Sequence, residues 1–178
     1  YEHYARLADK VKIPLLIYEH PRWQSTHLLT PALVSRLAAT GRYFGMKDCT
    51  GDLPRLTAMA DAGKGQFGVM QAVQEQLLTA LACGSTGACA TASNAYPHLY
   101  RRLYDTFQAG DIQKAYELQG TMQILLDMYN ASGGPKHVLN GLGLPINIAA
   151  RYTPKITEEQ ARVTDILAAF VKEELAGL

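Results

Sequence analysis

The sequence has almost no excess charge of either sign. Its 178 residues include 17 lysines and arginines and 16 aspartates and glutamates, which gives a formal net charge of +1. These charges are dispersed along the chain, so no basic patch marks a surface for nucleic acid or for an anionic membrane. We therefore expect neither of these polyanions as a partner.

Cysteine is scarce, and its spacing fits neither a disulfide framework nor a zinc site. Cys49, Cys83 and Cys89 are odd in number and contain no Cys-x-x-Cys pair. None of the five histidines has metal-ligand spacing to another histidine or to a cysteine. The pattern favours reduced cysteines in a cytoplasmic protein, and it predicts neither a metal site nor a cofactor.

The sequence also lacks a signal peptide and an apolar stretch long enough to span a bilayer. Its composition is that of a globular protein, with 48% apolar and 19% charged residues, which is sufficient for a sizeable buried core. It begins at Tyr1, inside a segment that reads as a helix, without an initiator methionine. This start indicates a fragment, a processed product or the second part of a longer chain.

Short apolar segments alternate with helical segments in the first part of the chain. Thr30 as N-cap and Pro31 at the first helical position mark one helix start. The apolar segments do not alternate with polar residues, which is typical of strands covered on both faces, and their alternation with helices indicates a parallel sheet. The expected strands are 13–18, 43–47, 67–70 and 86–91, and the expected helices between them are 31–39, 53–62 and 75–84.

After Asn94 the sequence predicts helices only. One covers 97–110, a second begins at Asp111, a short one follows Pro135, and the last is capped by Thr157. The last helix is expected to dock through one apolar stripe, which consists of Val163, Ile166, Leu167 and Phe170.

Tyr18 and Lys47 end the first two expected strands. In parallel β/α folds, functional groups gather where the carboxyl ends of the strands meet the following loops, so both side chains would face the same cavity rim. In a partly desolvated pocket a lysine amine is favoured in its neutral form and can attack a carbonyl carbon, while a nearby phenol moves protons. A lysine at a strand end can also simply extend into solvent. The position alone leaves both interpretations open.

Two motifs resemble those of the dihydrodipicolinate synthase and N-acetylneuraminate lyase family. "LIYEHP" at 16–21 is similar to its strand ending Tyr-x-x-Pro, and "YFGMKDCTGD" at 43–52 is similar to its later Gly-x-Lys-(acidic)-x-(Ser/Thr)-Gly-Asp segment. The order of the two motifs is also that of the family. Further similar segments are "GSTGACATASN" at 84–94, "FQAGDIQKAYELQ" at 107–119 and "GGPKHVLNGLGL" at 133–144, so the resemblance covers essentially the whole chain.

The resemblance implies an α/β fold of the (β/α)8 barrel type and a class I aldolase or lyase. Residues 1–110 would be the last four β/α units, the second half of the barrel, and 111–178 a C-terminal helical region. Lys47 would form a Schiff base with pyruvate or another 2-keto acid, and Tyr18 would relay protons. The implied substrate-binding residues are Asp48, Thr50 and Gly51 around the lysine, the backbone at Cys89, and Arg22.

The resemblance also implies that the first half of the barrel is missing. The family's Gly-Thr-Thr-Gly-Glu segment, which binds the carboxylate, and its second tyrosine are both absent from this sequence. We expect the missing half to be supplied by further residues of the same polypeptide or by another chain. The expected partners are a 2-keto acid, a possible aldehyde and further copies of the protein in a homotetramer or dimer.

This sequence departs from the family at the expected second-substrate site. Where the synthases carry an arginine after Tyr-x-x-Pro, the matching residue is Trp23, with Arg22 one position earlier. Glu19 and His20 replace an asparagine and a small apolar residue, which predicts a more acidic and bulkier pocket rim, although a histidine in a loop can equally be structural. Three alternatives stay open: a regulatory protein that binds a keto acid, a keto-sugar-acid dehydratase, and a structural half-barrel.

Overall fold

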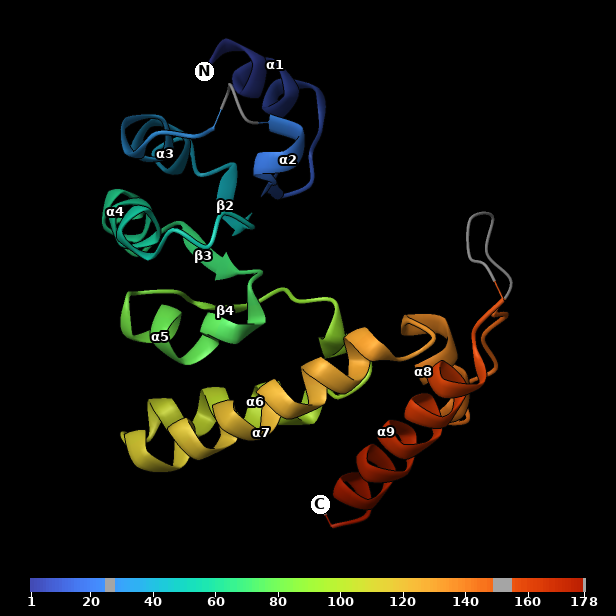
Figure 1. The fold of residues 1–178 in the computed structure, drawn as a ribbon. Helices are drawn as coiled ribbons and strands as arrows, with labels where there is room; N and C mark the ends of the chain where they lie inside the picture. Colours follow the sequence, from blue (N-terminus) through green and yellow to red (C-terminus); the bar gives the residue numbers. More distant parts are fainter. Residues whose placement is uncertain (25–27, 149–154, 178) are drawn as a thin grey trace. The chain divides into compact units, whose positions relative to one another are not determined.

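The computed structural model describes residues 1–24, 28–148 and 155–177, without the side chains of residues 23 and 24. The chain divides into two compact units, Tyr1–Ala90 and Thr91–Leu178 (Figure 1). The prediction that the barrel part ends at residue 110 concerns helix α6 (Pro97–Gln108). Only the complete barrel would show whether α6 is one of its helices. The boundary at residue 110 therefore stays a prediction.

The first unit is an α/β structure with one parallel sheet, as the alternating segments predict. Its strands are β1 (Leu15–Glu19), β2 (Tyr43–Asp48), β3 (Gly68–Gln71) and β4 (Gly87–Ala88), and they lie side by side in sequence order. Its helical segments are α1 (Glu2–Lys10), α2 (Pro21–Gln24), α3 (Pro31–Ala38), α4 (Leu53–Gly63), the short 3-10 turn η1 (Gln74–Gln76) and α5 (Leu77–Ala82). The Thr30 hydroxyl caps α3 by accepting the Leu33 N–H, which confirms that helix start.

The last strand is shorter than the sequence predicts. Residues 86–91 were expected to pair, but only Gly87 and Ala88 form the strand. On either side of it, the N–H groups of Thr86 and Cys89 donate to the Val69 and Gln71 carbonyls. Just before this strand, the Ser85 hydroxyl lies 2.8 Å from the carbonyls of both Val69 and Gly87. This side chain adds hydrogen bonds to backbone carbonyls at the start of the short strand.

Within Tyr1–Ala90, helices cover one face of the sheet. Ile17, Met46 and Val69 are buried in a core formed with α3 and α4. On the other face Leu16 is 43% and Tyr18 45% exposed. Apolar side chains therefore occupy both faces of β1, and coverage of the second face stays a prediction for the complete barrel.

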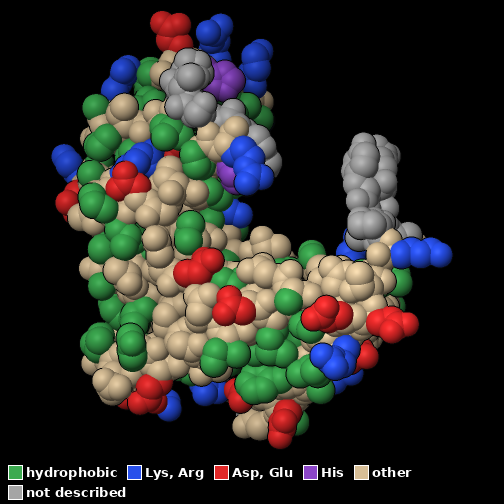
Figure 2. All heavy atoms as spheres, in the orientation of Figure 1, with side chains coloured by type: hydrophobic (Ala, Val, Ile, Leu, Met, Phe, Trp, Pro, Cys, Tyr) green, Lys and Arg blue, Asp and Glu red, His purple; other side chains and the backbone are tan. Residues whose placement is uncertain are grey.

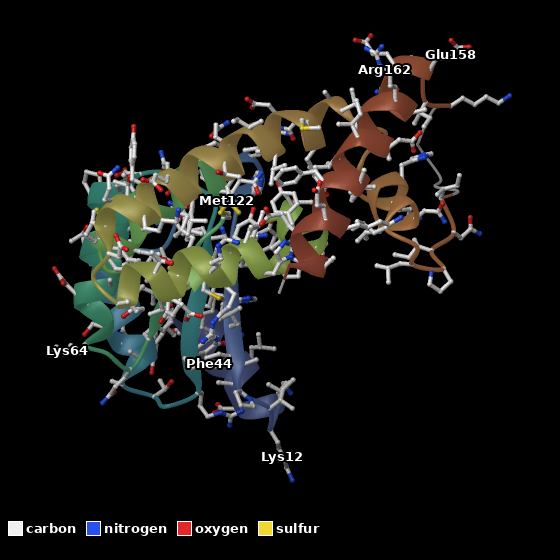
Figure 3. All side chains as sticks on the ribbon, turned by 90° about the horizontal axis from the view of Figure 1, so that it is seen from below. Lys12, Phe44, Lys64, Met122, Glu158 and Arg162 are labelled. Atoms are coloured by element: carbon white, nitrogen blue, oxygen red, sulfur yellow. The ribbon has the colours of Figure 1, made fainter. Side chains whose placement is uncertain are left out.

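Phe44 is the most exposed apolar side chain of β2. It is 53% exposed, and Figure 3 labels it on that strand. An aromatic ring of this size in water is typical of a surface that another element covers.

The second unit consists of helices in its described residues. They are η2 (Ala92–Asn94), α6, α7 (Ile112–Ala131), α8 (Pro135–Gly141) and α9 (Glu158–Ala176). Asp111 caps α7, and Thr157 caps α9 in a reciprocal capping box with Gln160, so both helix starts are confirmed. No described helix has the length and apolarity needed to cross a membrane. Acidic and basic side chains are interspersed over the face seen in Figure 2.

The buried stripe of α9 differs from the predicted one. The buried residues are Thr164, Leu167, Ala168 and Val171. Ile166 is 53% exposed, so its assignment to the docking stripe is wrong. The Thr164 hydroxyl donates to the Gln160 carbonyl within the helix and accepts the Gly133 N–H. Of the other predicted residues, Leu167 is buried and Val163 and Phe170 are half-buried. A polar residue can therefore lie in the buried row, and hydrophobicity alone misplaces Ile166.

Candidate active site

The register of the sheet places Tyr18 and Lys47 side by side. The two residues are direct partners in the parallel pairing of β1 with β2. The Lys47 Nζ lies 5.0 Å from the centroid of the Tyr18 ring, which is a cation–π distance when the amine is protonated. Both side chains belong to the face of the sheet that the helices of the first unit leave uncovered. The two residues that the sequence predicts as a pair are thus close in space.

Two cysteines contribute to the environment of Tyr18. Cys49, which follows β2, forms a side-chain hydrogen bond with Tyr18, and Cys89 interacts with it electrostatically. Partial desolvation, and after it Cys49, raises the pKa of the Tyr18 phenol above its ordinary value. The phenol therefore keeps its proton at neutral pH and is available as a proton donor. The ring of His20 contacts that of Tyr18 edge-on, with 6.1 Å between ring centroids.

The opposite face of the same strand ends holds a buried ion-pair network that the sequence analysis missed. The Arg55 guanidinium, from the first turn of α4, lies 2.5 Å from a Glu19 oxygen and 3.4 Å from an Asp48 oxygen. The two carboxylates are 1% and 0% exposed. Arg55 also donates to the Leu29 carbonyl, and Glu19 accepts the Leu29 N–H. The network ties the ends of β1 and β2 to the start of α4.

The position of Glu19 corrects the prediction of a more acidic rim. Glu19 and Asp48 are paired residues at the strand ends, one position beyond Tyr18 and Lys47, and so belong to the other face of the sheet. The carboxylate of Glu19 is therefore buried beside Arg55 and does not add charge to the rim. An acidic residue at each of two strand ends, with an arginine in the following helix, was the sequence signal for this network.

Asp48, Thr50 and Gly51 form the tight connection from β2 into α4. Asp48 accepts the Thr50 N–H at 2.8 Å, and the Thr50 hydroxyl accepts the Asp52 N–H at 3.2 Å. Asp52 then caps α4 by accepting the Arg55 N–H. Gly51 has φ +72°, a conformation that favours glycine. The connection starts from the residue after Lys47, so it fixes the backbone that carries the amine.

Gln71, the last residue of β3, and Arg22, a predicted substrate-binding residue, both make local contacts. Gln71 is 1% exposed, and its side chain accepts the Val73 N–H and donates to Gln76, so it holds its own loop. Arg22 is exposed on α2, and its backbone N–H donates to the His20 ring. The side chain of Trp23, which matches the arginine of the synthases, lies outside the described residues.

In the described residues, no group of three or more histidines, cysteines, aspartates and glutamates is placed to hold a metal ion. The polar groups at the strand ends are instead an amine, a phenol and two thiols on one face, and two carboxylates with a guanidinium on the other. An amine beside a protonated phenol can carry out carbonyl chemistry by nucleophilic attack and proton transfer.

Comparison with known proteins identifies the family. The model of the "Dihydrodipicolinate synthetase family" matches residues 1–170. A relative, the 4-hydroxy-tetrahydrodipicolinate synthase of Archaeoglobus fulgidus, is 28% identical over 171 residues, which are 94% of this chain and 59% of the relative.

Solved structures agree with this match. A provisionally named dihydrodipicolinate synthase from Thermus thermophilus has a TM-score of 0.78 at 32% identity, over 97% of this chain and 60% of the other. A prophage protein of the dihydrodipicolinic acid synthase family from Escherichia coli, in complex with pyruvate, has a TM-score of 0.80 at 24% identity, over 96% of this chain and 60% of the other. This chain therefore spans about three fifths of the relatives that it matches, and it belongs to the dihydrodipicolinate synthetase family.

Proposed function

We propose that the full-length protein that contains this chain is a class I aldolase or lyase, in which Lys47 forms a Schiff base with pyruvate or another 2-keto acid. The observation that carries the proposal is the position of the Lys47 Nζ, 5.0 Å from the centroid of the Tyr18 ring on the neighbouring strand. The family membership supports it, and so does the complex of the E. coli family member with pyruvate.

In the proposed reaction the neutral Lys47 amine attacks the ketone carbon of the keto acid. The resulting carbinolamine loses its hydroxyl group as water, and the nitrogen lone pair forms the C=N bond of the imine. The Tyr18 phenol donates the proton that the departing hydroxyl needs and recovers one from the nitrogen. When the neighbouring carbon–carbon bond breaks, the imine accepts its electron pair and becomes an enamine. When that bond forms, the imine first loses a proton from the adjacent carbon, and the resulting enamine supplies the electron pair. No cofactor is required for this sequence.

The proposal includes a complete (β/α)8 barrel. The four parallel strands of this chain would be its last four, and residues outside this chain would supply the others. The uncovered face with Leu16 and Tyr18 would then become interior lining. The complete protein would be a cytoplasmic homo-oligomer, a tetramer or a dimer.

The remaining residues have supporting roles in this proposal. Asp48, Thr50 and Gly51 shape the turn beside Lys47 through the hydrogen bonds and the positive φ described above. The backbone at Cys89 lies near the bound keto acid. Arg22, exposed on α2, binds the carboxylate of a second substrate.

The test of the proposed function is reductive trapping. The full-length protein is incubated with pyruvate and borohydride, and its peptides are analysed by mass spectrometry. We expect an irreversible adduct on Lys47 and none in Lys47→Met, whereas Lys64→Met, which changes a lysine at the end of α4 on the exposed surface, should react like the unmodified protein. Absence of the adduct, or its presence on another lysine only, would contradict the proposal.

A regulatory keto-acid-binding protein is the second candidate, because Trp23 stands where the synthases carry an arginine. A panel of aldehydes offered together with pyruvate separates the two candidates. Turnover with any aldehyde supports an aldolase, and loss of water from a keto-sugar acid supports a dehydratase. Trapping of the imine without any turnover supports the regulatory protein.

A further inference from the structure

Cys49 occupies a special position relative to the proposed catalytic pair. It directly follows β2, and its N–H donates to the Glu19 carbonyl at 3.1 Å, so the pairing of the two strands continues one residue beyond Asp48. Alternation along an extended strand places Cys49 on the same face as Lys47, two residues earlier. From there its side chain reaches the Tyr18 side chain in a hydrogen bond.

The protonation state of the thiol fits this contact. Burial is the main cause that raises the pKa of Cys49, Asp48 and Cys89 raise it further, and Lys47 and the hydrogen bond with Tyr18 lower it, with a net upward shift. The thiol therefore stays protonated at neutral pH. A neutral thiol can hold the phenol without placing a negative charge beside the amine, where it would favour the unreactive ammonium form.

We propose that Cys49 is a positioning residue, whose thiol holds the Tyr18 phenol in the orientation for proton transfer at the Lys47 nitrogen. The inference rests on the proposed function. The motif pattern at this position allows any residue, so the assignment comes from the contact and not from the motif.

Several groups face Tyr18, and the contributions of the following ones can be separated by substitution. Lys47 lies beside it on β2, Cys49 forms the hydrogen bond, Cys89 acts electrostatically, and His20 contacts the ring edge-on. Both cysteines raise the pKa of Tyr18, but only Cys49 does so through a side-chain hydrogen bond. Cys49→Ala removes this bond, Cys49→Ser retains a donor and acceptor at the same place, and Cys89→Ala leaves the bond intact.

Steady-state kinetics of the full-length protein test the positioning role. The loss of one hydrogen bond predicts a fall in kcat of roughly five- to tenfold in Cys49→Ala. The KM for pyruvate should change little, because the thiol acts on the phenol and not on the substrate. Cys49→Ser should recover most of the activity. Cys83→Ala, at the end of α5 and packed against the helix-covered core, is the matched control and should behave like the unmodified protein.

A second measurement does not depend on activity. Protein labelled with ¹³Cζ-tyrosine is titrated by NMR, and the Tyr18 signal is assigned as the one missing from Tyr18→Phe. Since the contact with Cys49 raises the pKa of Tyr18, its removal in Cys49→Ala should shift the Tyr18 titration to lower pH. Cys49→Ser should move it back towards the unmodified protein. The alkaline limb of the kcat–pH profile should shift in the same direction.

The outcomes separate the inference from the proposed function. A Tyr18 titration in Cys49→Ala that equals that of Cys83→Ala overturns the role of Cys49, as does a serine variant no more active than the alanine variant. The absence of a borohydride adduct in the unmodified protein overturns the proposed function instead, and the role of Cys49 with it, even where the NMR shift shows the contact. A lower kcat, serine rescue and the NMR shift together support the inference.

Discussion

At the scale of single residues, the phenol of Tyr18 has two separable parts. Its ring lies against the Lys47 amine, and its hydroxyl contacts Cys49. The ring provides packing and a cation–π contact, while only the hydroxyl can transfer protons. In the proposed mechanism, the hydroxyl accelerates formation of the Schiff base by transferring protons.

Tyr18→Phe should therefore preserve the Schiff base but slow its formation. Loss of a proton-transfer group predicts a fall in kcat of about a hundredfold or more. Borohydride trapping at long incubation times should still yield the Lys47 adduct. Tyr116→Phe, on the exposed surface of α7, is the control, since its side chain is 68% exposed. Equal rates in the two variants would contradict the assigned role of Tyr18.

His98 on α6 is the residue from which we predict a pH-dependent stability. Both of its ring nitrogens are buried, and neither has a hydrogen-bond partner within the described residues. Burial is the main cause that lowers its pKa in the folded protein, Arg102 lowers it too, and Glu174 partly opposes the shift. The unfolded chain then binds a proton more tightly than the folded one, so stability is lost as the pH falls below the unfolded value of about 6.5.

This prediction is checked by urea unfolding at about pH 7.5 and about pH 5.5, on either side of the unfolded pKa of histidine. The unfolding midpoint should fall on acidification, and it should fall less in His98→Leu, which removes the titrating group. An equal fall in both proteins would show that other groups cause the pH dependence.

At the scale of secondary-structure elements, the strand ends are fixed by buried charge. Arg55 lies in the first turn of α4 and forms ion pairs with the last residues of both β1 and β2. Removing one partner of a buried ion pair leaves the other charges unpaired in a medium that solvates them poorly. The network therefore couples the helix start to the two strands that carry the candidate site.

Arg55→Met should reduce the free energy of unfolding by about 3–5 kcal/mol, because Glu19 and Asp48 stay buried without their cation. The matched control is Arg6→Met, whose arginine side chain is 77% exposed on α1 and should contribute little. Denaturant unfolding measures both variants. A similar small loss of stability in Arg55→Met and Arg6→Met would mean that water solvates the carboxylates of Glu19 and Asp48.

Gly45 on β2 lies opposite Gly68 in the parallel pairing with β3. A Cβ at this position would lie 2.6 Å from the Gly68 carbonyl oxygen and 3.1 Å from Leu16 Cδ1. The backbone oxygen cannot rotate away, so a side chain here must push the two strands apart. The glycine thus permits the strand spacing two residues before Lys47.

Gly45→Ala should therefore lower the free energy of unfolding by roughly 1–3 kcal/mol. It should also reduce the yield of the borohydride adduct at Lys47. Gly120→Ala makes the same change in the middle of α7, where nothing lies within 4 Å of the added Cβ. It should stabilise the protein slightly, since glycine is a poor helix former. Thermal unfolding measures both variants: the melting temperature should fall in Gly45→Ala and rise in Gly120→Ala.

At the scale of the whole molecule, the uncovered face of the sheet is the main feature. Leu16 and Tyr18, which share this face of β1, are both more than two fifths exposed, at 43% and 45%. Neighbouring apolar side chains in water favour association with another surface. In the proposed barrel, that surface is the remaining set of strands.

The 178-residue chain expressed alone should consequently self-associate, and Leu16→Lys should reduce the association. Tyr116→Lys is the control, because Tyr116 is also exposed, at 68%, but belongs to α7 and not to a strand of the sheet. Sedimentation velocity at several concentrations measures the effect. Monomeric behaviour of the unmodified chain would mean that the face is stable in water.

The sequence by itself determined the parallel α/β arrangement, the helix starts at Thr30, Asp111 and Thr157, and the pairing of Tyr18 with Lys47 as candidates. These follow from short-range rules: capping depends on a few neighbouring residues, and parallel strands in β/α units bring their carboxyl ends together. The family motif supplied the chemical role proposed for the pair.

Only the tertiary structure decided which face of each strand is covered and what each polar group contacts. Glu19 is buried against Arg55, 36 positions along the chain, and Ile166 is exposed although its hydrophobicity predicts burial. The contact of Cys49 with Tyr18 likewise joins two separate strands. Such contacts depend on register and packing between distant segments, so residue types along the sequence can suggest them but do not determine them.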